Sequence, residues 1–136
     1  MKYYLSSFLL AGLAFCASGA MAEDATLPGA KLAKQTCFSC HNFTDETRTK
    51  TGPNLHGIVG MTPATQKNFT RYSKELKEIG NGGAVWDEAT LTEYLSDPTA
   101  FLRENSTNDK ARSTMVFRKL TDEQVAQIVD YLETLK

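Results

Sequence analysis

The pentapeptide at residues 37–41 constrains this chain more than any other feature. Cys37 and Cys40 stand three positions apart, and His41 follows the second cysteine directly. This Cys-x-x-Cys-His spacing is the attachment signature of a c-type haem. One helical turn carries both thiols to the vinyl groups at one edge of the porphyrin, and the next residue is placed to give its imidazole to the iron. The motif therefore predicts one haem c, bound covalently through Cys37 and Cys40.

The first 22 residues have the features of a secretory signal peptide. Lys2 gives a positive start, residues 5–17 form a short, mostly apolar run, and Ala20-Met21-Ala22 is a small-x-small cleavage site. We expect export to the periplasm, cleavage after Ala22 and a mature domain spanning residues 23–136. The apolar run is short for a membrane span, so an uncleaved anchor is disfavoured. Lipidation at Cys16 is also disfavoured, because the bulky Phe15 stands where a lipoprotein cleavage site needs a small residue.

Other sites built from the haem-motif residues fit the chain less well. A thioredoxin-like Cys-x-x-Cys motif needs a βαβ unit, and no stretch of this sequence has the pattern of a strand. A structural zinc site needs four ligands. The mature chain adds only His56, and fourteen residues separate it from His41. A simple disulfide between Cys37 and Cys40 leaves His41 unexplained.

Length and composition indicate a single globular domain. The chain has 136 residues, of which 41% are apolar and 23% are charged. Its formal net charge is −1, so nothing points to a polyanionic partner, and nucleic-acid binding is not expected.

The pattern of apolar residues predicts an all-α domain with short helices and long loops. No run alternates with period two for long enough to indicate a strand. Residues 103–114 are polar and are expected to form an exposed loop. The helices are expected at 29–35, at about 70–79 with Gly80 ending the helix, after the N-cap Asp87, from Pro98 through Leu102, and from Thr121 to the C-terminus.

The last helix has the clearest signals. Thr121 and Gln124 form a capping box, and an apolar stripe at helical spacing continues as far as Leu135. The other helices are short and need packing in order to persist. A covalently held porphyrin would provide that packing as a large apolar plate.

A second axial ligand of the iron has to come from far along the chain. The mature methionines are Met61 and Met115, and a thioether ligand raises the reduction potential of a haem. Met115 follows the polar loop and precedes the last helix, so its position favours it over Met61. His56 is a further alternative, although we interpret it as a turn residue.

Four more residues are candidates for contacts with the haem or its ligands. The carbonyl of Pro53 is suited to accept a hydrogen bond from the ring of His41, because a ligating histidine needs an acceptor that orients it. Tyr72, Trp86 and Tyr94 have groups that can donate to propionates or to the methionine sulfur. Spacing alone is equally consistent with ordinary core aromatics.

Taken together, these residues resemble the class I c-type cytochromes, and most closely the long soluble bacterial members of the cytochrome c2 and c-550 type. The resemblance covers residues 29–135. Its anchors are the motif at 37–41, Thr51-Gly52-Pro53-Asn54-Leu55-His56-Gly57, Trp86, Glu93-Tyr94-Leu95-Ser96-Asp97-Pro98, Met115-Val116-Phe117 and Tyr131-Leu132.

The resemblance implies the class I cytochrome c fold and a role for each candidate residue. It implies a close crossing of the first and last helices, where Gly29 meets Tyr131. The implied roles are thioether attachment for Cys37 and Cys40, axial ligation for His41 and Met115, hydrogen bonding to His41 for Pro53, propionate binding for Tyr72 and Trp86, and contact with the methionine sulfur for Tyr94.

The resemblance also implies a function. We expect a monomeric, periplasmic electron carrier that is not an enzyme. Its partners would be a quinol-oxidising cytochrome bc complex as donor, and a terminal oxidase or photosynthetic reaction centre as acceptor. The alternative is a dedicated electron acceptor of a periplasmic dehydrogenase.

The chain departs from the family pattern at three positions. Met61 stands where an arginine facing a propionate is common, and Thr36 and Thr114 stand where lysines are common. Fewer basic residues are therefore expected around the exposed haem edge, where such residues dock the protein onto its partners. The remaining basic candidates at that edge are Lys31, Lys34, Lys50, Arg112, Arg118 and Lys119.

Overall fold

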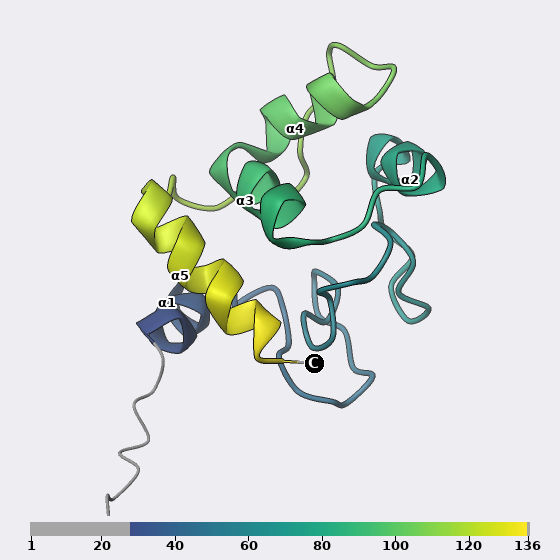
Figure 1. Cartoon of the computed structure of the whole chain (residues 1–136). Helices are drawn as coiled ribbons and strands as arrows, with labels where there is room; N and C mark the ends of the chain where they lie inside the picture. Colours follow the sequence, from purple (N-terminus) through teal and green to yellow (C-terminus); the bar gives the residue numbers. More distant parts are fainter. Residues whose placement is uncertain (1–27, 136) are drawn as a thin grey trace, which may run out of the picture.

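The computed structural model describes residues 28–135, and this part of the chain is helical with no strand (Figure 1). The prediction of an all-α fold is therefore confirmed. The predicted signal peptide, residues 1–22, lies outside the described residues. The helices are α1 (Pro28–Thr36), α2 (Lys74–Asn81), α3 (Glu88–Ser96), α4 (Pro98–Asn105) and α5 (Asp122–Glu133).

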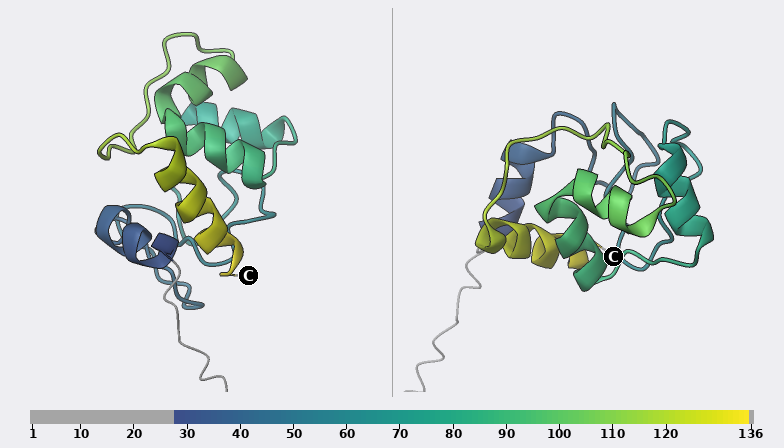
Figure 2. Two further views of the ribbon diagram at one scale, coloured as in Figure 1. Left: turned by 60° about the vertical axis from the view of Figure 1, so that its left-hand side comes forward. Right: turned by 90° about the horizontal axis from the view of Figure 1, so that it is seen from above.

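Helices α1 and α5 cross in close contact, although they come from opposite ends of the described chain (Figure 2). Gly29 makes this approach possible. A Cβ atom at that position would lie 1.8 Å from the carbonyl oxygen of Gln127 and 2.9 Å from Cβ of Tyr131. The crossing expected between Gly29 and Tyr131 is present, and it brings the haem motif, which follows α1, against the C-terminal helix.

The apolar stripe of α5 forms the centre of the core. Val125, Ile128, Val129 and Leu132 are buried, and the helices in contact with α5 are α1 and α3. The predicted capping box of Thr121 and Gln124 starts the helix. The helix ends at Glu133, so Leu135 lies beyond it, although its side chain still packs against the core.

The predicted start of the second helix, near residue 70, is wrong. Helix α2 begins at Lys74 because the hydroxyl of Ser73 accepts a hydrogen bond from the backbone N–H of Leu76 at 3.1 Å. Its predicted end is also wrong, because Gly80 lies inside the helix. A Cβ there would lie 2.2 Å from the carbonyl oxygen of Pro63, so the glycine serves packing against that loop.

The predicted loop at 103–114 starts too early, because α4 continues to Asn105. The helix end is satisfied locally, with the hydroxyl of Ser106 donating to the carbonyl of Leu102 at 2.6 Å. Arg103 then donates from Nε to the carbonyl of Ala111 at 2.9 Å. This bond ties the loop back to α4, so the polar segment returns to the core just before Met115.

The α1–α5 crossing gives a first prediction. Gly29→Ala should destabilise the protein by about 1–3 kcal/mol, the usual cost of overpacking. Alanine is the better helix former by about 1 kcal/mol, but the backbone carbonyl of Gln127 cannot move aside without shifting α5. Chemical denaturation measures the difference, and Lys31→Ala, on an exposed position of α1, is the control. Equal stability of the two variants would contradict the proposed role of the crossing.

Candidate functional site

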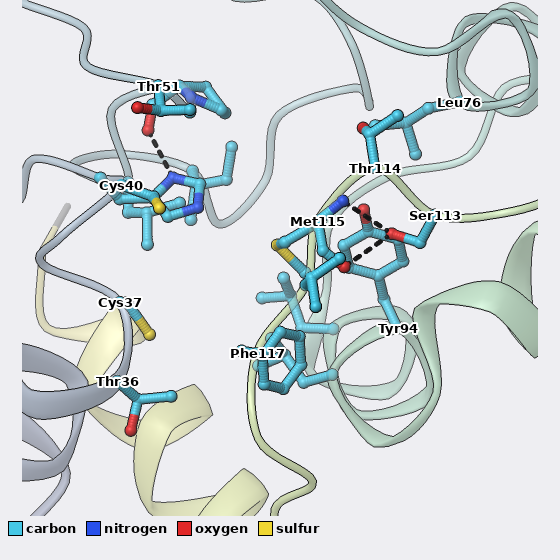
Figure 3. Close-up of a pocket in the computed structure, with 18 of the residues that line it drawn as sticks. Thr36, Cys37, Cys40, Thr51, Leu76, Tyr94, Ser113, Thr114, Met115 and Phe117 are labelled. Atoms are coloured by element: carbon cyan, nitrogen blue, oxygen red, sulfur yellow. Dashed lines mark hydrogen bonds between the residues drawn. The ribbon is translucent and has the colours of Figure 1, made fainter.

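A cavity of about 560 Å³ lies between the loops and the helical core. Its volume is in the range of small-molecule and cofactor sites. The walls come from the segment after α1, the loops around residues 51–58 and 69–73, the helices α2, α3 and α5, and residues 113–117. Figure 3 shows part of this lining. The loops and helices thus enclose one site, built from segments that are distant in sequence.

The turn after α1 directs Cys37 and Cys40 into this cavity. The backbone N–H groups of Cys40 and His41 both donate to the carbonyl of Cys37, at 3.0 and 2.9 Å. The two sulfur atoms lie on the same side of the cavity (Figure 3), and both thiols are free. Burial, together with the neighbouring thiol of Cys40, raises the pKa of Cys37 to about 11. A thiol with this pKa is not an activated nucleophile at neutral pH.

His41 is buried, with 8% of its surface exposed. Its Nδ1 donates to the carbonyl oxygen of Pro53 at 2.7 Å, so the contact expected from the sequence is present. Because Nδ1 carries the proton in this arrangement, Nε2 is the nitrogen free to act as a ligand. Burial lowers the pKa of His41, with the charge of Lys50 adding to that effect and the Pro53 carbonyl opposing it.

Met115 lies across the cavity from the cysteines, with its sulfur directed towards them (Figure 3). Ser113 holds this residue in place. Its hydroxyl accepts from the backbone N–H of Met115 at 3.1 Å and donates to the carbonyl of Met115 at 3.1 Å. Met61 and His56, the alternative ligands, line a separate hollow of about 340 Å³ instead.

The three aromatic candidates, Tyr72, Trp86 and Tyr94, all line the cavity. Trp86 and Tyr94 also belong to a packed cluster with Phe101, with ring centroids 5.0 to 6.0 Å apart. Burial raises the pKa of Tyr94, and a hydrogen bond with Ser113 opposes the rise. Trp86 and Tyr94 are therefore core residues that also form part of the cavity wall, and the haem contacts expected of all three rings stay predictions.

Sequence reasoning missed three residues of this site. A Cβ on Gly52 would lie 2.4 Å from Cε1 of His41, so this glycine makes room for the imidazole. Ser113 was read as part of a polar loop, although it orients Met115. The hydroxyl of Thr36 is buried in the cavity wall without a hydrogen-bond partner. Only the small size of Gly52, next to Pro53, offered a signal in the sequence.

Comparison with known proteins identifies the family. The family model of cytochrome c matches residues 27–136. The chain is 36% identical over 135 residues to cytochrome c2 of Rhodospirillum rubrum, covering 99% of this chain and 98% of that protein. It is 40% identical over 108 residues to cytochrome c-550 of Novispirillum itersonii, covering 79% of this chain and 96% of that protein.

A solved structure supports the same relationship. The crystal structure of cytochrome c2 from Rhodobacter sphaeroides superposes with a TM-score of 0.71 at 38% identity, covering 78% of this chain and 91% of the other. The predicted class I cytochrome c fold is therefore confirmed. Across residues 28–135, no helix has the length and apolar character needed to span a membrane.

The residues around the cavity fit one covalent haem c. The thiols of Cys37 and Cys40 are one helical turn apart, an imidazole with a free nitrogen lies beside them, and a thioether faces them. No cluster of three or more His, Cys, Asp or Glu residues suited to a bare metal ion occurs in the described chain. The predicted cofactor, haem c held through both cysteines, therefore agrees with the family and with the geometry.

The contact between Gly52 and His41 gives a second prediction. Gly52→Ala should displace the imidazole and lower the stability of the haem-loaded protein by about 1–3 kcal/mol. Thermal unfolding followed by haem absorbance measures the loss, and Thr51→Ala, at the exposed neighbouring position, is the control. Wild-type stability and an unchanged spectrum in Gly52→Ala would show that the ring tolerates a neighbouring methyl group.

Proposed function

The chain belongs to the cytochrome c family, and from that premise we propose that it is a periplasmic, monomeric electron carrier. It takes single electrons from a cytochrome bc complex and passes them to a terminal oxidase or a photosynthetic reaction centre. The observation that carries the proposal is the placement of His41 and Met115 at one cavity, together with the two attachment cysteines. Electron transfer is the role of the family as a whole.

We assign Nε2 of His41 and the sulfur of Met115 as the two axial ligands. Haem c held by these two side chains would supply a one-electron Fe(III)/Fe(II) couple, and the thioether would favour the reduced form. Because two side chains would complete the ligation of the iron, no coordination site would be open to a substrate. The chain is therefore a carrier and not an enzyme in this proposal.

The surrounding residues keep the two ligands in fixed positions. The Pro53 carbonyl orients His41, and Ser113 bonds Met115 at both its N–H and its carbonyl. The cluster of Trp86, Tyr94 and Phe101 fills the wall with large rings in mutual contact. The structure of a rigid, largely apolar cavity changes little when the haem gains or loses an electron. Rapid electron transfer requires such a small structural change.

The proposed location rests on the N-terminal sequence. Residues 1–22 have the features of a signal peptide with cleavage after Ala22. The R. rubrum relative is aligned over 99% of this chain, so the comparison extends across the N-terminal segment. Export would bring Cys37 and Cys40 to the compartment in which bacteria attach haem c.

The surface beside the cavity is suited to brief contact with a protein partner. Phe38, inside the attachment motif, is 53% exposed, and Val116, next to Met115, is 87% exposed. Lys50 lies over the ring of Phe38, with its Nζ 3.4 Å from the ring centroid. The exposed ring of Phe38 with its neighbouring cation fits a redox partner whose docking site is apolar with acidic side chains at its edge.

The assignment of Met115 as a ligand gives a third prediction. In Met115→Ala, the weak absorption band at the red end of the visible spectrum should disappear from the ferric protein, because this band comes from the bond between methionine sulfur and Fe(III). Carbon monoxide should also bind readily to the haem of this variant. The reduction potential should fall by about 0.1 V or more, within the roughly 0.8 V range that axial ligands span. Met61→Ala is the matched control and should retain all three properties. The assignment is wrong if Met115→Ala retains the three properties and Met61→Ala loses them.

The identity of the partner gives a fourth prediction. Electron transfer from a purified cytochrome bc complex should slow as ionic strength rises, since salt screens exposed charges beyond about 10 Å at 0.1 M. Lys50→Gln should weaken the salt dependence, whereas Lys67→Gln, which removes a charge beside the separate hollow, should not. Rapid reduction by a periplasmic dehydrogenase and slow reduction by the bc complex would favour the alternative function.

A further inference from the structure

Among the residues of segment 28–135 that line the haem cavity, Arg71 is the single Lys or Arg, and none is Asp or Glu. The other lining residues that can titrate are Cys37, Cys40, His41, Tyr72 and Tyr94. In the haem-loaded protein the two cysteines are consumed as thioethers. His41 would be taken up as a ligand of the iron, and burial raises the pKa of both tyrosines, so they stay neutral. The described part of the wall therefore presents one permanent positive charge and no permanent negative charge.

The guanidinium group of Arg71 is held in a defined place. Its Nη2 atom donates to the carbonyl oxygens of Lys50 at 2.8 Å and Thr51 at 3.2 Å. Its Cζ atom lies 5.4 Å from the centroid of the buried Phe69 ring. These contacts bind Arg71 to the same loop that supplies Gly52 and the acceptor carbonyl of Pro53. The charge is thus fixed at the edge of the cavity on the side of His41.

Part of the guanidinium remains available for a ligand. An arginine has five N–H donors in a planar fork. In the described part of the chain the Nε and Nη1 groups of Arg71 make no hydrogen bond, and no carboxylate forms an ion pair with it. The single ion pair found there joins Arg48 to Glu46. Neither backbone carbonyl carries a formal charge, so the positive charge of Arg71 has no partner within the described protein.

We propose that Arg71 binds a propionate of the haem through this free part of its guanidinium group. Haem c brings two carboxylates into a cavity whose wall has one fixed cation, and the planar fork of arginine matches the two oxygens of a carboxylate. The inference rests on the proposed haem site. It adds a cofactor-binding residue that sequence reasoning did not single out, and it couples the propionate to the loop that positions His41.

The test follows the reduction potential of the haem-loaded protein as a function of pH. Removal of the cation should raise the pKa of the bound propionate, so in Arg71→Gln the fall of the potential with rising pH should begin about one pH unit higher than in the wild type. Above both transitions the potential of this variant should be lower, because a nearby positive charge favours the reduced haem. Arg71→Lys keeps the charge without the fork and should lie between the two.

Arg48→Gln is the matched control. Arg48 is exposed, as Arg71 is, but it lies outside the cavity, so removal of its charge should leave the pH profile unchanged. The inference is wrong if the reduction potential depends on pH in the same way in Arg71→Gln and in the wild type. This holds even if the variant unfolds more easily, because Arg71 would then only stabilise the loop through its hydrogen bonds. The mass of the purified wild-type protein tests the haem site itself. If this mass shows no covalently bound haem, the proposed function is wrong, and this inference is wrong with it.

Discussion

The hydrogen bond from Nδ1 of His41 to the carbonyl of Pro53 is the contact on which the rest of the site depends. It joins the turn after α1 to a loop twelve residues later, and it leaves one ring nitrogen free for a ligand. Gly52 allows the imidazole to lie against the loop. The same loop is held by Arg71 through two backbone carbonyls. One short segment thus determines both the direction of the histidine and the position of Arg71, the one Lys or Arg that the described residues bring to the cavity wall.

The two sides of the cavity are built in different ways. On the side of the cysteines, a helix and its following turn set the geometry through backbone hydrogen bonds, and the crossing at Gly29 anchors that helix to α5. On the other side, Met115 lies in irregular chain and is positioned by Ser113. The helices are short and the walls are mostly apolar, so burial against a large apolar cofactor is an effective source of stability for such a fold.

The boundaries that sequence reasoning placed wrongly share a physical cause. Periodicity finds the middle of a helix, whereas its ends depend on single hydrogen bonds and on neighbours that the sequence does not show. The hydroxyl of Ser73 starts α2, and α4 continues past Leu102 to Asn105. Gly80 has the composition of a helix stop, yet it lies within α2 because the loop at Pro63 passes too close for a side chain.

The sequence by itself determined the all-α class, the five helical regions and the covalent haem, because each follows from local spacing: the attachment motif, capping residues and apolar stripes. It also favoured Met115 over Met61, but only by order along the chain. Tertiary structure placed Met115 at the cavity and Met61 and His56 at a separate hollow. It alone brought Arg71 to the loop before Pro53. Such placements depend on how distant segments pack against each other, and no local pattern encodes that packing.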